Sequence, residues 1–168
     1  LQEEATIPAD LGIFLPRTYR MHPDVCSIIS NHVYEGRLES DSSASKHVID
    51  TTGPLIKRQS GICFIPVEHE GNTQGSEEEV EVISSIAEEL LGSCFWAEKR
   101  GTEKRELGWN DVLFVAPYNY QVNLLRKDLG AQAKVGSVDL FQGQEAPVVV
   151  ISMCSSDASD IPRWHPVP

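Results

Sequence analysis

Apolar residues recur at helical spacing in three segments of this chain, and each segment is bounded by residues that start or stop helices. The starts are a proline at a first-turn position or a capping side chain, namely Pro23, Ser76 and Asn119. The stops are glycines, namely Gly36, Gly92 and Gly130. The pattern therefore predicts three helices, which begin and end close to these residues.

The start of the second predicted helix carries two further signals. Ser76 and Glu79 have the spacing of a capping box, in which each side chain accepts a hydrogen bond from the other residue's backbone N–H. Glutamates at 77, 78 and 79 also suit the positive end of the helix dipole.

Continuous apolar runs predict buried strands at residues 62–67, 112–116, 135–138 and 148–152. A shorter apolar run at 11–15 is closed by Pro16. The polar residues 39–60 are predicted as a loop, and the charged residues 95–109 as a hairpin or excursion. Strands that are apolar on both faces and alternate with helices indicate an α/β fold with a parallel sheet. This order fits a RecA-like α/β/α sandwich, and it fits many other doubly wound folds equally.

Composition indicates one globular domain of 168 residues, with 40% hydrophobic residues. No apolar run approaches the length of a membrane-spanning helix, and the N-terminus lacks the pattern of a signal peptide. The chain begins without Met, so we expect it to be part of a longer protein. The four cysteines are widely spaced, which favours reduced thiols in a cytoplasmic protein over a zinc site or disulfides, and no metal site is predicted.

The net charge of −11 argues against free-standing affinity for nucleic acid. Many of the acidic residues are clustered at 77–81 and 88–89, where they most simply form the solvent-exposed face of a helix. The sequence also contains neither a Gly-x-x-x-x-Gly-Lys-Ser/Thr loop nor a Gly-x-Gly-x-x-Gly motif. No acidic pair that could hold Mg²⁺ follows a strand. The chain alone therefore has no evident means to cradle a triphosphate.

Residues 18–23 read Thr-Tyr-Arg-Met-His-Pro and place Arg20 just before a helix N-terminus. A guanidinium there can clamp phosphate bidentately, and the adjacent Tyr19 offers a flat face to a base or ribose. The alternative is a surface arginine beside a packed tyrosine, with His22 in a structural role at the helix entry.

Residues 138–145 read Val-Asp-Leu-Phe-Gln-Gly-Gln-Glu and lead into the last predicted strand. Backbone at Gly143 can approach a ligand closely, and Glu145 can accept hydrogen bonds from a ribose hydroxyl. The alternative is an ordinary solvated turn.

Residues 115–122 form a third candidate segment, in which Pro117, Tyr118 and Asn119 follow the carboxyl end of a predicted strand. Ligands of open α/β sheets gather at that edge, and a helix N-terminus there can hold a phosphate. The alternative for Tyr118 is a hydrophobic anchor of the helix.

These segments resemble signature motifs of superfamily 1 helicases, in the branch that includes the nonsense-mediated-decay helicase. Residues 18–23, extended by Tyr-Glu-Gly-Arg-Leu at 34–38, are similar to motif IV, and residues 138–152 are similar to motif V. Residues 115–122 are similar to the family's Thr-Pro-Tyr-x-x-Gln-Val segment. All belong to the second RecA-like domain of that family. The resemblance thus implies a RecA-like α/β/α sandwich with a mostly parallel sheet over residues 1–156.

The resemblance also implies roles for individual residues. Tyr19 packs on the nucleotide, and Arg20 acts as an arginine finger on its phosphates. Gly143 and Glu145 face the nucleotide. The residues implied to contact a nucleic-acid strand are Pro117, Tyr118, Asn119 and Ser137. Thr18 stands where the family usually has Gln, which leaves open any contact made by that Gln.

In the complete enzyme the resemblance implies ATP and Mg²⁺ as cofactors. The implied partners are a first RecA-like domain and single-stranded nucleic acid, and the chain alone is expected to be inactive. Bacterial proteins that join a RecB-like nuclease to this helicase type are the closest in appearance, so a fused nuclease is implied at the family level. Motif VI should follow Ser156, but residues 157–168 form a Pro-rich tail instead. A truncated gene, a frameshift or a segment boundary would each explain that tail.

The competing interpretation is a non-catalytic, doubly wound α/β module that docks a partner or a small ligand. It predicts the same secondary structure and the same acidic surface. In a RecA-like domain, Arg20, Tyr118 and Glu145 are expected along one carboxyl-end face of one sheet, whereas the competing module does not require this. The choice between DNA and RNA and the polarity of translocation stay open.

Overall fold

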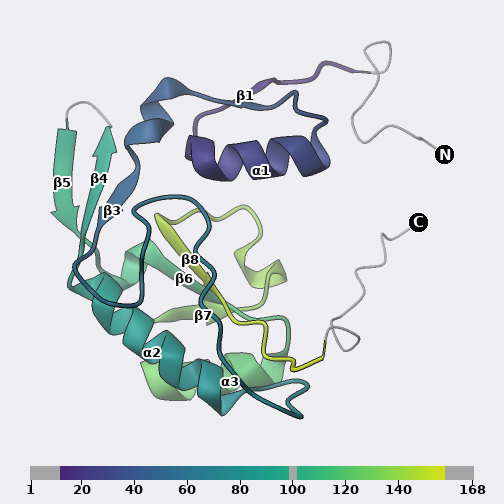
Figure 1. The fold of residues 1–168 in the computed structure, drawn as a ribbon, viewed down its shortest axis with the longest axis vertical. Coiled ribbons are helices and arrows are strands. Elements are labelled where there is room, and N and C mark those ends of the chain that lie inside the picture. Colours follow the sequence, from purple (N-terminus) through teal and green to yellow (C-terminus); the bar gives the residue numbers. More distant parts are fainter. Residues whose placement is uncertain (1–11, 99–101, 158–168) are drawn as a thin grey trace. The chain divides into compact units, whose positions relative to one another are not determined.

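The computed structural model of the protein describes residues 12–98 and 102–157, which form a mixed α/β structure (Figure 1). The chain divides into two compact units, and each is described here by itself. The first comprises residues 1–64 and 93–105, and the second comprises residues 65–92 and 106–168. Nearly all of the predicted Pro-rich tail, residues 158–168, lies outside the described residues.

In its described residues, the first unit contains one α-helix and short strands. Its elements in chain order are β1 (Arg17–Thr18), α1 (Pro23–Val33), β2 (Glu39–Ser40), the 3₁₀ helix η1 (Ser42–Lys46), β3 (Val48–Asp50), β4 (Cys94–Glu98) and β5 (Thr102–Glu106). Strands β1 and β2 pair in parallel, and β3 pairs antiparallel with β4. Because β5 lies beside β4, the hairpin predicted within residues 95–109 is confirmed (Figure 1).

Helix α1 begins and ends as its sequence predicts. Pro23 occupies its first turn, where the missing N–H costs no hydrogen bond. The chain leaves the helix through two residues in the left-handed region, Glu35 with φ of 55° and Gly36 with φ of 75°. The Gly36 N–H donates to the Ser30 carbonyl at 2.9 Å, which satisfies a carbonyl in the last turn.

One prediction for the first unit is wrong. Residues 39–60 are not simply a loop, because β2, η1 and β3 lie within them. Short polar residues build these elements through local bonds; Asp41, for example, caps η1 by accepting from Ser43 N–H. The first strand, β1, follows Pro16 and lies outside the apolar run at 11–15. Ile13 is 92% exposed and Leu15 is 77% exposed, so this run does not form a core strand.

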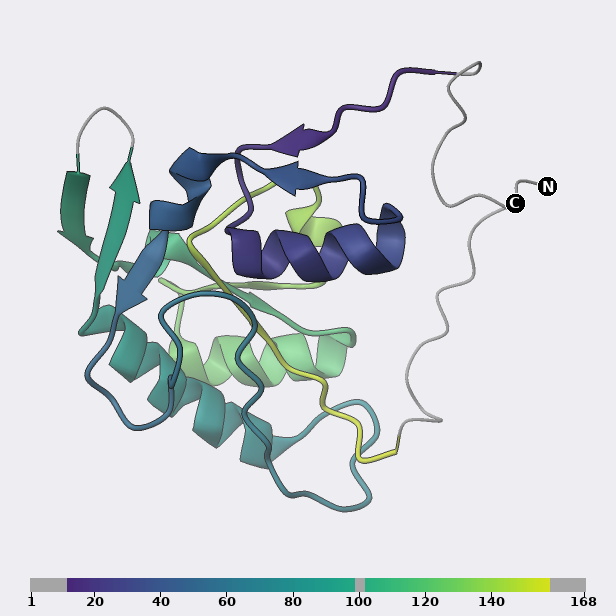
Figure 2. The same ribbon diagram turned by 45° about the horizontal axis from the view of Figure 1, so that its top comes forward.

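The second unit is built on a three-stranded parallel sheet. Its elements in chain order are α2 (Glu77–Leu91), the 3₁₀ helix η2 (Trp109–Asp111), β6 (Val112–Val115), α3 (Asn119–Leu129), β7 (Lys134–Gly136), the 3₁₀ helix η3 (Asp139–Phe141) and β8 (Val148–Ile151). The strand order is β7-β6-β8, and β6 pairs in parallel with both neighbours. Helices α2 and α3 lie side by side on one side of this sheet (Figures 1 and 2).

The core of the second unit follows the predicted apolar pattern in β6 and α2, whereas the last strand, β8, was predicted as buried and instead exposes Val149 by 50% and Ile151 by 62%. Every residue of β6 is buried, with Phe114 only 1% exposed. The apolar face of α2 is also buried and comprises Val80, Ile83, Ile86, Ala87 and Leu90. Burying each of the larger aliphatic side chains stabilises the fold by about 1.5–3 kcal/mol. Gly92 caps the carboxyl end of α2, and Gly130, with φ of 83°, does so for α3, as predicted.

The strand predicted at residues 62–67 is wrong. The segment forms no strand, Phe64 is 83% exposed, and Ile62 is 51% exposed. Pro66 lacks the N–H that a sheet ladder requires, which weakens any strand there. The described strands also belong to three small sheets instead of one mostly parallel sheet. The predicted α/β class with parallel strands is nevertheless confirmed. Within the described residues, no helix is long and apolar enough to cross a membrane.

Candidate functional site

In the first unit, Tyr19 and Arg20 lie in the turn that joins β1 to α1. Both residues are exposed, Tyr19 by 66%. The Arg20 backbone N–H donates to Thr18 Oγ1 at 3.3 Å, within the turn. Ser40 Oγ donates to the Met21 carbonyl at 2.6 Å, from strand β2. Hydrogen bonds therefore hold the backbone on both sides of Arg20, and the residue itself is exposed.

His22 fixes the end of the same turn. Its Nδ1 accepts from the Asp24 backbone N–H at 3.1 Å and so caps α1. Its Nε2 lies 3.1 Å from the Ser45 carbonyl oxygen, to which a protonated Nε2 donates. The neutral imidazole with its proton on Nε2 satisfies both contacts. His22 is thus a structural residue at the helix entry.

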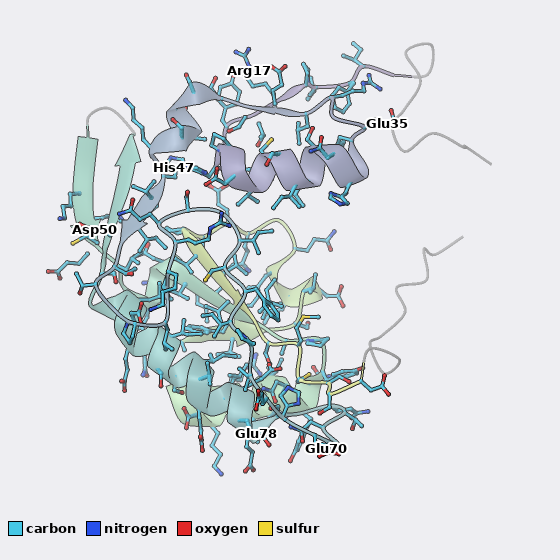
Figure 3. All side chains as sticks on the ribbon, viewed as in Figure 1. Arg17, Glu35, His47, Asp50, Glu70 and Glu78 are labelled. Carbon is cyan, nitrogen blue, oxygen red and sulfur yellow. The ribbon has the colours of Figure 1, made fainter. Side chains whose placement is uncertain are left out.

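Asp41 organises the segment that faces this turn. It accepts hydrogen bonds from the Ser43 backbone N–H at 3.0 Å and from Ser43 Oγ at 2.8 Å, and these bonds hold the pKa of the carboxyl below its ordinary value. Arg17, labelled in Figure 3, approaches Asp41 at 3.8 Å. This arginine is 56% exposed, so the ion pair itself adds little stability.

In the second unit, the turn after β6 lies beside the residue after β7. The two parallel strands are in register at Val115 and Gly136, and Ala116 N–H donates to the Gly136 carbonyl at 3.1 Å. One carboxyl-end edge therefore holds four predicted residues, which are Pro117, Tyr118, Asn119 and Ser137. Pro117 and Asn119 are exposed. Asn119 was expected to cap α3, but it is the first residue of that helix, and Tyr118 occupies the cap position.

The segment between β7 and β8 holds Gly143 and Glu145. Gly143 has φ of 81°, a conformation that favours glycine, and among the described residues beyond its two chain neighbours no atom lies within 4 Å of the position that a Cβ would occupy. Because β7 and β8 both run parallel to β6, this connection must return along the sheet. Glu145, which is exposed, precedes the amino end of β8 by three residues. Tyr118 and Glu145 therefore leave the sheet at different ends, contrary to the expectation, and Arg20 belongs to the other unit.

The structure assigns Glu79 a role that the sequence pattern does not predict. Ser76 Oγ accepts from Glu79 N–H at 3.1 Å, which confirms one half of the capping box. The carboxylate, however, is buried and bonds residues after β8. It accepts from Ser152 Oγ at 2.5 Å, from Cys154 N–H at 3.0 Å and from His69 Nε2 at 3.2 Å. Glu79 thus joins the start of α2 to the end of β8.

Gln121 replaces Glu79 in the other half of the capping box. This side chain on α3 is fully buried, and its Oε1 accepts from Ser76 N–H at 2.8 Å. Its Nε2 donates to the Ser76 carbonyl at 3.1 Å and to Ser152 Oγ at 3.0 Å. One amide therefore links three chain segments beside the Pro117–Asn119 turn.

His69 extends this network to the surface. Its Nδ1 lies 2.7 Å from Ser156 Oγ, while its Nε2 contacts Glu79. Ser156 Oγ also accepts from Asn72 N–H at 3.0 Å, and Ser156 N–H donates to the Asn72 carbonyl at 2.8 Å. The Ser156 hydroxyl, the His69 imidazole and the Glu79 carboxylate thus connect the loop at residues 69–72 to the segment after β8 and form a clamp between them.

Cys154 and Glu78 illustrate opposite electrostatic effects at this clamp. Burial, together with the Glu79 carboxylate, raises the pKa of the Cys154 thiol to about 11. Hydrogen bonds from its own backbone N–H, from Ser76 and from Asn72 lower the pKa of Glu78. Figure 3 shows Glu78 at the amino-terminal end of α2. Among the residues that the structure describes, no group of three His, Cys, Asp or Glu side chains could hold a metal ion.

Comparison with known sequences identifies the family. A family model described as "AAA domain" matches residues 3–161, nearly the whole chain. The protein belongs to this AAA domain family. The family's fold is RecA-like, in agreement with the parallel strands described above.

The AAA domain is similar to segments of much longer proteins. DNA-binding protein SMUBP-2 of Rattus norvegicus is 27% identical over 154 residues, which cover 83% of this chain and 14% of the relative. Probable helicase MAGATAMA 3 of Arabidopsis thaliana is 29% identical over 161 residues, which cover 82% and 18% respectively. DNA polymerase alpha-associated DNA helicase A of Saccharomyces cerevisiae is 24% identical, with 88% and 23% covered. The chain thus spans less than a quarter of these relatives.

Within this AAA domain the predicted residues form three groups. Tyr19 and Arg20 share one turn in the first unit, and the Pro117–Asn119 turn with Ser137 shares one sheet edge in the second. Gly143 and Glu145 lie apart from both, in the connection between β7 and β8. Sequence reasoning missed Ser40 and the buried contacts of the Glu79 carboxylate, because their partners are distant in the chain. Gln121 was noted only as part of the motif at 115–122, and its buried hydrogen bonds were not predicted.

Proposed function

We propose that this chain is the C-terminal motor half of an ATP-dependent helicase. The observation that carries the proposal is Arg20, exposed in a backbone-anchored turn at the entry of α1. The names of several relatives, which describe helicases or a DNA-binding protein, support it. In this proposal Arg20 is an arginine finger that stabilises charge on the transferred phosphoryl group.

The remaining candidate residues divide between nucleotide and nucleic acid. Tyr19 offers an exposed ring next to Arg20, and Gly143 and Glu145 form an exposed turn with the left-handed backbone that glycine favours. In the proposal these three residues contact the nucleotide.

The edge formed by Pro117, Tyr118, Asn119 and Ser137 contacts the backbone of a single strand. Support comes from the exposed Pro117 and Asn119 at the start of α3, where backbone N–H groups favour an anion. The net charge of −11 makes this contact weak in the isolated chain and sensitive to salt.

ATP and Mg²⁺ fit this chain only in part. Arg20 and Tyr19 suit a phosphate and a ring, but the sequence contains no Walker loop to cradle a triphosphate. The proposal therefore places ATP and Mg²⁺ on a first RecA-like domain and assigns to this chain only the contacts that complete the site. A fused RecB-like nuclease and a cytoplasmic location belong to the same proposal. So does a partial C-terminal RecA-like helicase domain spanning residues 1–156.

ATP hydrolysis by the full-length protein tests the proposal. With single-stranded oligonucleotide present, Arg20→Ala should lower kcat by a factor of order 10³ and change the KM for ATP far less, because a finger acts on charge that develops in the transition state. A change in kcat below about threefold would favour the surface-arginine interpretation. The isolated chain should show no hydrolysis above background, and it should bind a labelled single strand more tightly than duplex in fluorescence anisotropy.

A further inference from the structure

The turn that carries Arg20 is held by one short segment, Glu39–Ser45, which we call the cradle segment. Strands β1 and β2 set Thr18 opposite Ser40, and Asp41 N–H donates to the Thr18 carbonyl at 2.8 Å. The cradle segment thereby holds the start of the turn through backbone bonds, which do not depend on any side chain.

A single hydroxyl of the cradle segment holds the middle of the turn. Ser40 Oγ donates to the carbonyl of Met21, the residue directly after Arg20, at 2.6 Å. That distance is at the short end for a hydroxyl donor, whereas the bond from Arg20 N–H to Thr18 within the turn is longer, at 3.3 Å. Ser40 is half-buried, which shields its hydroxyl from competing water.

We propose that Ser40 is a positioning residue that aims Arg20. The inference rests on the proposed function, in which Arg20 must meet a phosphoryl group bound elsewhere. Such contacts require a geometry held to about 0.5 Å, and a misplacement of about 1 Å can cost a factor of roughly 10² in rate. Removing the Ser40 hydroxyl frees the Met21 carbonyl but leaves the backbone pairing of β1 with β2 intact. The Ser40→Ala variant should therefore fold normally but hold Arg20 less firmly in its position.

The test uses steady-state ATP hydrolysis by the full-length protein. We expect Ser40→Ala to lower kcat by roughly 10- to 100-fold with the KM for ATP changed less than about twofold. Ser40→Thr keeps the hydroxyl and should retain kcat within about threefold. Ser45→Ala is the matched control: its hydroxyl contacts only the Ser42 carbonyl, while its backbone carbonyl still serves His22. This control should leave kcat unchanged.

The double variant separates positioning from general stability. If Ser40 acts through Arg20, Ser40→Ala should have no further effect on kcat in an Arg20→Ala background. Equal effects in both backgrounds, or an unchanged kcat for Ser40→Ala alone, would overturn the inference. An unchanged kcat for Arg20→Ala would instead refute the proposed function, and with it the premise of the inference. Impaired Arg20→Ala beside normal Ser40→Ala would refute the inference alone.

Discussion

Replacing Gln121 with leucine should destabilise the fold strongly, although leucine is apolar and of similar size. The amide is fully buried and makes three hydrogen bonds, two to the backbone of Ser76 and one to Ser152 Oγ. Leucine fills the volume but can replace none of these bonds. The Ser76 N–H then loses its acceptor in a buried position.

The expected loss of stability depends on which hydrogen bonds the former partners of Gln121 retain in the variant. The Ser76 carbonyl retains the Val80 N–H at 3.3 Å, and Ser152 Oγ retains its bond to Glu79 at 2.5 Å. One stranded backbone N–H costs about 1–3 kcal/mol, and each of the two other lost bonds costs about 0.5–1.5 kcal/mol. Together the lost bonds cost about 2–6 kcal/mol, and burying leucine offsets about 1.5–3 kcal/mol of this. We therefore expect a net loss of about 2 kcal/mol in the free energy of unfolding.

Urea unfolding followed by circular dichroism measures this loss. Gln132→Leu is the matched control, because the same chemical change occurs at an exposed side chain whose amide donates only to the Leu129 carbonyl. The control should cost less than about 1 kcal/mol. If Gln121→Leu costs no more than Gln132→Leu, the buried network does not hold α2, α3 and β8 together as argued.

Three further predictions follow from the ionisable groups. Cys154 is fully buried and the pKa of its thiol is raised to about 11, so at pH 8 iodoacetamide should modify the exposed Cys63 and spare Cys154, as peptide mass spectrometry would show; equal labelling would contradict the buried network. Because that pKa is raised above its ordinary 9.0, stability should fall as pH rises from about 9 toward 11, which Tm measurements can follow. The pKa of Asp41 is instead lowered from 3.8 by its bonds to Ser43, so its contribution is present at neutral pH and is lost in acid. The Tm difference between wild type and Asp41→Ala should accordingly shrink below about pH 4, and a constant difference would show that ionisation of Asp41 is irrelevant.

Local signals in the sequence predict the helices well. Pro23, Gly36, Gly92 and Gly130 act within one turn of their own positions, so no tertiary information is needed to interpret them. Glu79 is an example of a residue whose role local rules do not predict. Its spacing from Ser76 satisfies the capping box, yet its carboxylate bonds Ser152, which is 73 residues away.

The strands and the arrangement of the site depend on pairing that periodicity does not reveal. Residues 62–67 have the composition of a strand, but their apolar side chains are largely exposed and no partner strand is present among the described residues. The polar residues 39–46 appear loop-like, yet Glu39 and Ser40 pair with β1, and Ser40 holds the Arg20 turn. Strand direction also decides that Tyr118 and Glu145 leave the sheet at different ends.

The most direct test of the proposed arginine finger compares the affinities of the full-length protein for ADP and for ADP with aluminium fluoride, which mimics the transferred phosphoryl group. Arg20→Ala should weaken binding of the mimic by about the factor lost from kcat, of order 10³, and leave ADP binding nearly unchanged. Arg17→Ala, which removes an exposed arginine three residues earlier, should alter neither affinity. Equal losses for ADP and the mimic, or no loss for the mimic, would contradict the assignment of Arg20 as a finger.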